Sequence, residues 1–216
     1  MQRLETSETY YESLRSTTVK QRHNATAFAE QVWELSFALE AHVRLPALNL
    51  PDFSSGPDVR DPAGAAKVVR EAWGLGEAPV GHLVARMEAN GIICCLAPTS
   101  EQEVARINAY STLAFGRPVV VLTPDRSDDV FRHRFSAAHE LGHLVLHGGS
   151  PSGEPWLERE ANAFAAEFLA PAMVMADALP RRINFHELYR MGAPWGVPVE
   201  ALVCRAQEPG RMSRCP

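Results

Sequence analysis

The sequence predicts an α+β protein in which a small mixed β-sheet is followed by a largely helical half. Three observations lead to this fold class: a long helical pattern near the N-terminus, short apolar or β-branched runs between residues 92 and 122, and helical spacing of apolar residues from about Val130 onward. With 216 residues, of which 46% are hydrophobic, the chain can form one sizeable core with an appendage, and a disordered chain is excluded.

The N-terminal part is predicted to be a helical arm. From about Thr18 to Val43, apolar residues recur at steps of three and four and would share one helix face. They are Phe28, Val32, Leu35, Leu39 and Val43. The next stretch, residues 45–62, contains four prolines and favours a linker or an arm that follows the surface. We therefore divide the chain into an arm with its linker, residues 1–62, and a domain, residues 63–216.

The first part of this domain is predicted to contain helices and then strands. Helices are expected over residues 63–73 and 80–90, and Gly91 suits the C-terminal cap of the second. Strand patterns cover residues 92–96, 105–111 and 118–122. The remaining helices are expected over residues 130–147, 157–170, 172–179, 184–191 and 198–206.

Charge and composition disfavour several classes of protein. The formal net charge is −5, so the chain has no basic excess with which to neutralise nucleic-acid phosphates or to bind an anionic membrane. The N-terminus lacks the pattern of a secretory leader, and no apolar run approaches the roughly 18 to 20 residues that span a bilayer. Four cysteines without a CxxC pair are typical of thiols in a reducing compartment. We expect a cytoplasmic protein that binds neither nucleic acid nor membrane.

One motif carries chemistry. His139, Glu140 and His143 form H-E-x-x-H within a predicted helix, where residues four apart share a face. The two imidazoles can therefore bind one zinc ion, and Glu140 can take a proton from zinc-bound water, whose pKa zinc lowers to about 7. Gly142 is a poor residue for a helix interior and indicates a close approach of another backbone. These features predict a zincin-like helical core.

A third protein ligand is needed, and the next helix offers two candidates. Glu158 and Glu160 flank the apolar stripe of that helix, so only one of them can face the metal. We favour Glu158, because Asn162 lies one turn further on the same flank and can orient a ligand histidine. Glu160 is the alternative. His147 lies about 12 Å along the helix from His139, too far to share the ion, and is interpreted as a helix cap.

Two further residues are weaker candidates. Tyr110 lies at the end of a predicted strand, where its hydroxyl could stabilise a tetrahedral intermediate. Arg134 lies near the start of the motif helix and could contact a substrate carbonyl. The ordinary alternatives are a packed tyrosine and a surface charge.

The stretch RFSAAHELGHLVLH followed by EREANAFAAEFLAP resembles the ImmA/IrrE family of zinc metallopeptidases. The resemblance extends upstream through LVARMEANGIICCL, INAYS and RPVVVLT and downstream through WGVPVEALVCRA, and so covers about residues 72–207. It implies that His139, His143 and Glu158 hold the metal and that Glu140 is catalytic, in agreement with the choice made from spacing. The domain over residues 63–216 is thus expected to be metallopeptidase-like.

The resemblance also implies a function. It implies an endopeptidase that cleaves a helix-turn-helix transcriptional repressor and so relieves repression of genes for stress response or mobile-element transfer. A cleaved segment of the repressor could add to an edge of the small sheet. Many relatives carry a helix-turn-helix domain of their own, and we expect none before residue 18 here. Two alternatives remain: a regulatory or sensing module that binds a repressor without cutting it, and the C-terminal part of a transcription regulator.

Overall fold

The computed structural model describes nine stretches of the chain. They are residues 9–11, 18–51, 61–97, 109–113, 116–123, 129–148, 154–176, 178–180 and 184–206. Within them the fold is a mixed α+β arrangement of a small sheet and mostly helices, as the sequence predicts. The strands are β1 (Thr9–Tyr11), β2 (Ile93–Leu96), β3 (Ala109–Thr112) and β4 (Val119–Leu122). The helices are α1 (Val19–Glu40), α2 (Pro62–Ala72), α3 (Leu83–Ala89), α4 (Val130–Leu146), α5 (Pro155–Leu169), α6 (Ala172–Met175), α7 (Phe185–Trp195) and α8 (Val199–Ala206).

The four strands form one mixed sheet in the order β1-β3-β4-β2. β2 runs parallel to β4, while β3 is antiparallel to both of its neighbours, β4 and β1. The strand β1 was not predicted from the sequence, because three residues are too few to show an alternating pattern. It pairs with a strand about a hundred residues further along the chain, so no local turn signals the pairing either.

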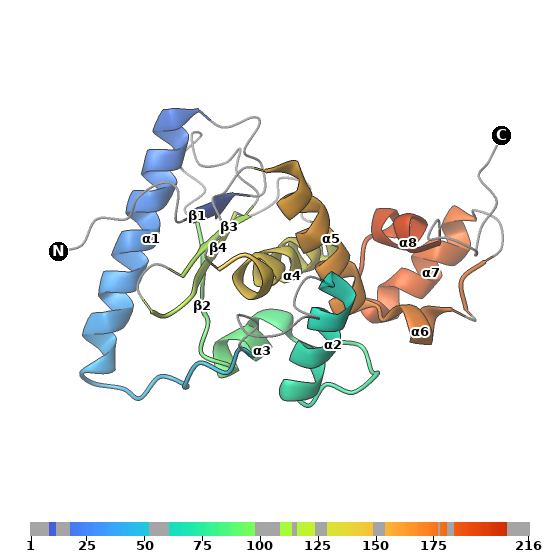
Figure 1. The fold of residues 1–216 in the computed structure, drawn as a ribbon, viewed down its shortest axis with the longest axis horizontal. Helices are drawn as coiled ribbons and strands as arrows, with labels where there is room; N and C mark the ends of the chain where they lie inside the picture. The colour runs from blue at the N-terminus through green and yellow to red at the C-terminus, as the bar shows by residue number, and fades with distance from the viewer. Residues whose placement is uncertain are drawn as a thin grey trace.

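The sheet separates two apolar clusters (Figure 1). On one face α1 packs through Ala25 and Ala29 against Tyr110, Val119 and Val121. On the other face lies the main core, to which the helices from α2 onward contribute (Figure 1). The alternation of a strand explains the division, since neighbouring residues of β3 and β4 point to opposite faces.

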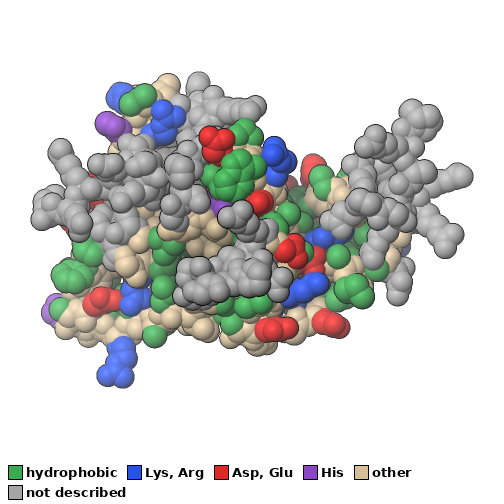
Figure 2. All heavy atoms as spheres, in the orientation of Figure 1, with side chains coloured by type: hydrophobic (Ala, Val, Ile, Leu, Met, Phe, Trp, Pro, Cys, Tyr) green, Lys and Arg blue, Asp and Glu red, His purple; other side chains and the backbone are tan. Residues whose placement is uncertain are grey.

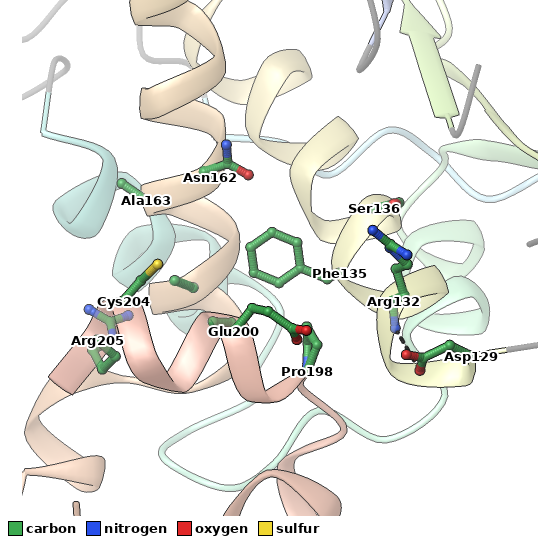
Figure 3. Close-up of a pocket in the computed structure, with 12 residues that line it drawn as sticks. Asp129, Arg132, Phe135, Ser136, Asn162, Ala163, Pro198, Glu200, Cys204 and Arg205 are labelled. Carbon is green, nitrogen blue, oxygen red and sulfur yellow. Dashed lines mark hydrogen bonds between the residues drawn. The ribbon is translucent and has the colours of Figure 1, made fainter. Parts of the chain in front are cut away.

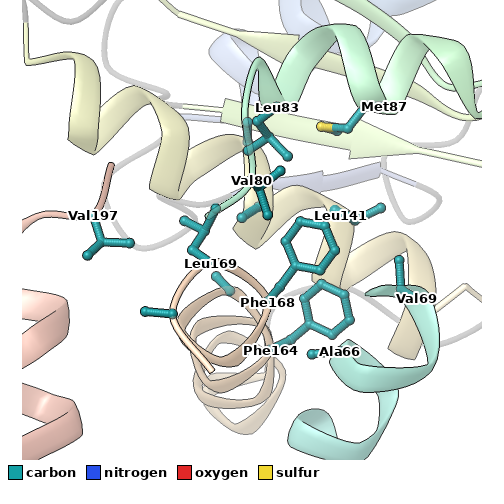
Figure 4. Close-up of a cluster of buried hydrophobic side chains, with 14 of the residues drawn as sticks. Ala66, Val69, Val80, Leu83, Met87, Leu141, Phe164, Phe168, Leu169 and Val197 are labelled. Atoms are coloured by element: carbon teal, nitrogen blue, oxygen red, sulfur yellow. The ribbon is translucent and has the colours of Figure 1, made fainter. Parts of the chain in front are cut away.

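The main core is built around α5. Phe164 and Phe168 are fully buried and stacked, with ring centroids 5.7 Å apart (Figure 4). Trp73, at the end of α2, meets Phe168 edge-on. Leu141 of α4 and Val69 of α2 lie around the same two rings (Figure 4). The burial of these rings sets the rotation of α5 about its own axis, and therefore decides which of its polar residues face α4.

Polar caps explain where three of the helices begin. Thr18 and Gln21 form a reciprocal capping box at the start of α1. Asp61 accepts hydrogen bonds from the first backbone N–H groups of α2, whose first residue is a proline. Asp129 does the same for α4, accepting from the N–H groups of Phe131 and Arg132. The start of the motif helix is therefore determined by its local sequence.

The buried face of α1 differs from the one the sequence predicts. Phe28 and Val32 pack against the sheet, but Leu35, Leu39 and Val43 are exposed. The buried positions are instead Gln21, Ala25, Thr26 and Ala29 in the first half of the helix. Figure 2 shows hydrophobic side chains at the surface along the lower end of α1. The sheet is too small to cover a helix of 22 residues, so α1 packs against it only as far as about Trp33.

Several boundaries also differ from the prediction. The helix expected over residues 80–90 begins only at Leu83, because His82 adopts a left-handed conformation with φ 46°. The helix expected over residues 172–179 ends at Met175, whereas α7 continues past Met191 to Trp195 and closes at Gly196, whose φ is 63°. Residues 105–108 of the predicted middle strand lie outside the described residues.

The part of the proline-rich stretch that the structure describes, residues 45–51, follows the surface of the domain. The N–H of Asn49 donates to the carbonyl of Asn90, and the indole N–H of Trp73 donates to the carbonyl of Asn49. The guanidinium of Arg117 donates to the carbonyl of Pro46 and forms an ion pair with Glu40 at 2.8 Å. Among the described helices, none combines the length and apolar character needed to cross a bilayer.

Candidate metal centre

The site lies where α4 and α5 pack side by side. The two helices run in opposite directions, because His139 contacts Asn162 whereas His143, one turn later, contacts Glu158, one turn earlier on α5. Gly142 permits the close approach: a β-carbon at this position would lie 3.2 Å from the Ala161 Cα and 3.1 Å from the Phe164 ring. The close backbone contact expected from Gly142 is therefore present.

Three side chains converge in this groove. The Nε2 atoms of His139 and His143 lie 3.0 Å apart. One Glu158 oxygen lies 3.3 Å from the His139 Nε2, and the other lies 3.5 Å from the His143 Nε2. Both rings are buried, and the carboxylate is partly exposed on the open side of the groove. The structure thus brings together the three residues that the sequence predicts as ligands, and as a group they can hold a metal ion.

Contacts on the far side of each ring decide which nitrogen carries a proton. The Nδ1 of His139 lies 3.1 Å from the Asn162 amide oxygen, which only accepts, so Nδ1 donates and Nε2 keeps its lone pair. The Nε2 of His147 donates to Glu160 at 3.0 Å, which leaves its Nδ1 as an acceptor. The Nδ1 of His143 then donates to that atom at 3.0 Å, and its Nε2 also keeps a lone pair.

This pattern of hydrogen bonds is the test of whether a metal fits. Two imidazole lone pairs and two carboxylate oxygens point at one another across about 3 to 3.5 Å with no hydrogen between them. These electron pairs repel one another unless a cation lies between them. Two histidines and one glutamate are a ligand set that binds zinc. The residues present therefore fit a zinc ion.

The surroundings of the three side chains also favour the protonation states that bind a metal. Desolvation lowers the pKa of His143 to about 4, although contacts with Glu158 oppose it, so the ring is neutral at pH 7. Partial burial would raise the pKa of Glu158, but its close contacts with His139 and His143 outweigh the burial and lower the pKa to about 2. The three residues are therefore two neutral rings and one anion, the forms that bind a cation.

His147 and Glu160 have a role that the sequence analysis missed. His147 lies at the C-cap of α4, as expected, but its side chain is buried and joins His143 to Glu160. Glu160 is therefore the hydrogen-bond partner of His147 and does not join the group of three. The sequence feature that could have indicated the contact between His143 and His147 is their spacing of four residues, which places both rings on one face of the helix.

Glu140 lies on the side of α4 that faces the sheet and is fully buried. The hydroxyl of Ser111 in β3 donates to one of its carboxylate oxygens at 2.6 Å. Ser111 is a second residue that the sequence analysis missed, because the contact joins positions 29 apart on different elements. The hydrogen bond holds one oxygen of the residue that follows the first histidine of the motif.

Tyr110 and Arg134 do not reach the site. Since Ser111 faces α4, its neighbour Tyr110 points to the opposite face of the sheet, where it packs with α1. The half-buried Arg134 donates to the carbonyls of Val80 and Gly196 and so joins α4 to the segments before α3 and α8. The structure therefore does not bring these two side chains to the group of three, and both have structural partners elsewhere.

A cavity of about 550 Å³ lies near the site, although none of the group of three lines it. It lies between α4, α5 and α8, and Phe135, Asn162, Glu200 and Cys204 line it (Figure 3). Asn162 lines this cavity and also accepts the hydrogen bond from His139, so the cavity begins next to the first histidine. Most of the exposed lining is apolar, and its charged residues are two carboxylates, Asp129 and Glu200, and two guanidiniums, Arg132 and Arg205.

The fold and this site define a metallopeptidase-type protein. Residues 91–207 match the peptidase family M78, described as the IrrE N-terminal-like domain, and the chain belongs to this family. The matched stretch begins later than the resemblance over residues 72–207, so that β1 and α1–α3 lie outside it. A search of curated proteins found no significant match.

Proposed function

We propose that the protein is a zinc-dependent endopeptidase whose substrate is a helix-turn-helix transcriptional repressor. The observation that carries the proposal is the convergence of His139, His143 and Glu158, together with the buried Glu140 that follows His139 in the same motif. Family membership supports peptide-bond hydrolysis, and the donor set supports zinc. The choice of a repressor as substrate rests on the family resemblance alone.

In this proposal His139, His143 and Glu158 hold the ion, and Asn162 and His147 orient the two rings. When bound, zinc acts as a Lewis acid on the scissile carbonyl and on the attacking water. Glu140 accepts the proton of the attacking water and then donates it to the leaving nitrogen. Ser111 holds one oxygen of Glu140, which limits the rotation of the carboxylate between the two proton transfers. The apolar cavity beside Asn162 would receive a substrate side chain.

The test compares Glu140→Gln and Glu158→Ala with the wild type. Each protein is first treated with zinc and freed of unbound metal, and its zinc content is measured by plasma mass spectrometry. It is then incubated with a panel of purified helix-turn-helix repressors, and cleavage is followed by intact-mass spectrometry. We expect Glu140→Gln to keep zinc but to cleave about 10²–10⁴-fold more slowly. Glu158→Ala should lose both zinc and cleavage.

Two outcomes would overturn this proposal. Cleavage by Glu140→Gln at the wild-type rate would remove Glu140 from the reaction. Stable binding of a repressor by the wild type and by Glu140→Gln, with no cleavage by either, would instead favour a regulatory module that acts by binding.

A further inference from the structure

The strand β1 covers the edge of the sheet that lies next to Glu140. β3 is the strand whose Ser111 contacts this carboxylate, and in the sheet order β1-β3-β4-β2 only β1 lies outside it. The register pairs Thr9 with Thr112, Tyr10 with Ser111 and Tyr11 with Tyr110. Backbone from the N-terminal segment therefore lies directly opposite the residue that holds the proposed catalytic carboxylate.

This edge suits an extended peptide. An unpaired edge strand offers a row of N–H and C=O groups that another strand can pair with, and several peptide-binding proteins recognise ligands in this way. The inner edge of β3 is already paired with β4. A peptide that added to β3 could therefore do so only where β1 now lies. Its residue opposite Ser111 would lie on the α4 face of the sheet, the face of the Ser111–Glu140 contact.

The pairing of β1 with β3 has features that would let another strand replace β1. Among the described residues, three take part, and they pair with residues about a hundred positions away without a tight turn to enforce the register. β1 has one strand neighbour in the described sheet, so its loss would leave the pairing of β3 with β4 and of β4 with β2 intact. The sheet can therefore survive without this strand.

We propose that Thr9–Tyr11 is an intrachain inhibitory strand, which holds the outer edge of β3 in the free protein and must leave before an extended peptide substrate can pair there. This inference rests on the proposed peptidase function, which it deepens by naming the main-chain binding site and its internal competitor. A bound substrate would run antiparallel to β3, in the direction that β1 now takes.

The first experiment weakens the pairing of β1, so that the outer edge of β3 is exposed. Tyr10→Pro removes a backbone N–H from the middle of β1 and disfavours its pairing, whereas the control Tyr10→Val retains the N–H and a strand-forming side chain. The probe is a fluorescent peptide with the sequence of residues 6–14, TSETYYESL, and binding is measured by fluorescence polarisation with the full-length proteins. We expect Tyr10→Pro to bind the peptide at least tenfold more tightly than the wild type and Tyr10→Val. We also expect faster hydrogen exchange at the amides of β3.

The second experiment links β1 covalently to β3, so that the outer edge of β3 stays covered. Thr9 and Thr112 lie directly opposite each other in antiparallel strands, where Cα separations suit a disulfide, so Thr9→Cys with Thr112→Cys can lock β1 in place. Single Thr112→Cys under the same oxidant is the matched control. The oxidised double variant should neither bind the peptide nor cleave a repressor, and reduction should restore both. Circular dichroism and thermal unfolding verify that each variant is folded.

The results separate this inference from the proposed function. Equal peptide affinity for wild type, Tyr10→Pro and the locked variant, or cleavage by the locked variant at the wild-type rate, overturns the inhibitory strand. Glu140-dependent cleavage can hold in that case. Conversely, the inhibitory strand is supported if the peptide binds more tightly to Tyr10→Pro and does not bind to the locked variant. This result would stand even if Glu140→Gln showed that hydrolysis does not depend on Glu140.

Discussion

The Nδ1 atoms of His143 and His147 lie 3.0 Å apart on one face of α4, and His147 passes this contact on to Glu160 through its other nitrogen. The pair extends the site by one helical turn beyond the H-E-x-x-H motif. It also fixes the tautomer of His143, since Glu160 accepts the only proton that a neutral His147 can carry on Nε2.

Removing this support should weaken zinc binding without abolishing it. His147→Phe and Glu160→Gln are each expected to lower zinc affinity about 10–100-fold, because His143 loses the partner that orients its ring. Glu154→Gln is the matched control, since this residue precedes the same helix and its side chain makes no capping hydrogen bond. Competition with a chromophoric chelator measures the affinity. Unchanged affinity in His147→Phe would show that the contact does not orient the ligand.

Gly142 should be intolerant of a side chain. Gly142→Ala gains about 1 kcal/mol of helix propensity but forces the new methyl group against Ala161 and Phe164, at a cost of about 1–3 kcal/mol. We expect a net loss of about 1 kcal/mol in the free energy of unfolding, measured with urea, and weaker zinc binding as α4 and α5 separate. Gly81→Ala has open space around the new methyl and should change neither quantity. A stabilised Gly142→Ala would contradict the close approach.

The metal-free protein should lose stability on mild acidification. The pKa of His143 is about 4 in the folded protein, below the ordinary histidine value of 6.5 that applies to the unfolded chain. Between these values the unfolded chain binds the extra proton, so stability falls as the pH falls. The loss attributable to this residue reaches at most about 3 kcal/mol near pH 4. Guanidinium unfolding at pH 7 and pH 4.5 measures it. His143→Gln should show a smaller pH dependence; an equal one would assign the loss to other groups.

Three of the cysteine thiols should differ in reactivity. Burial raises the pKa of Cys94 far above the usual range and that of Cys95 to about 12, so at pH 8 very little of either is thiolate. Cys204 is exposed on α8. Site-resolved mass spectrometry after brief iodoacetamide treatment should find Cys204 labelled well before Cys94 and Cys95. Unfolding in urea should remove the difference, and equal labelling of the three in the native protein would contradict the partial burial of Cys94 and Cys95.

The local sequence was sufficient for the fold class, for most helices and for the two histidines of the motif. A four-residue step places His139 and His143 on one face of any helix, whatever surrounds it. Asp129 and Thr18 mark helix starts because a cap acts within one turn. The preference for Glu158 over Glu160 also came from spacing, through the shared flank with Asn162.

The contacts between residues far apart in the sequence were decided by the tertiary structure. The burial of Phe164 and Phe168 sets the rotation of α5, which turns Glu158 toward the two rings and Glu160 toward His147. The pleat of β3 sends Ser111 to Glu140 and Tyr110 to the opposite face, and the pairing of β1 with β3 spans about a hundred residues. Periodicity specifies which residues of one element share a face, whereas the partner of that face depends on packing among elements that no local pattern encodes.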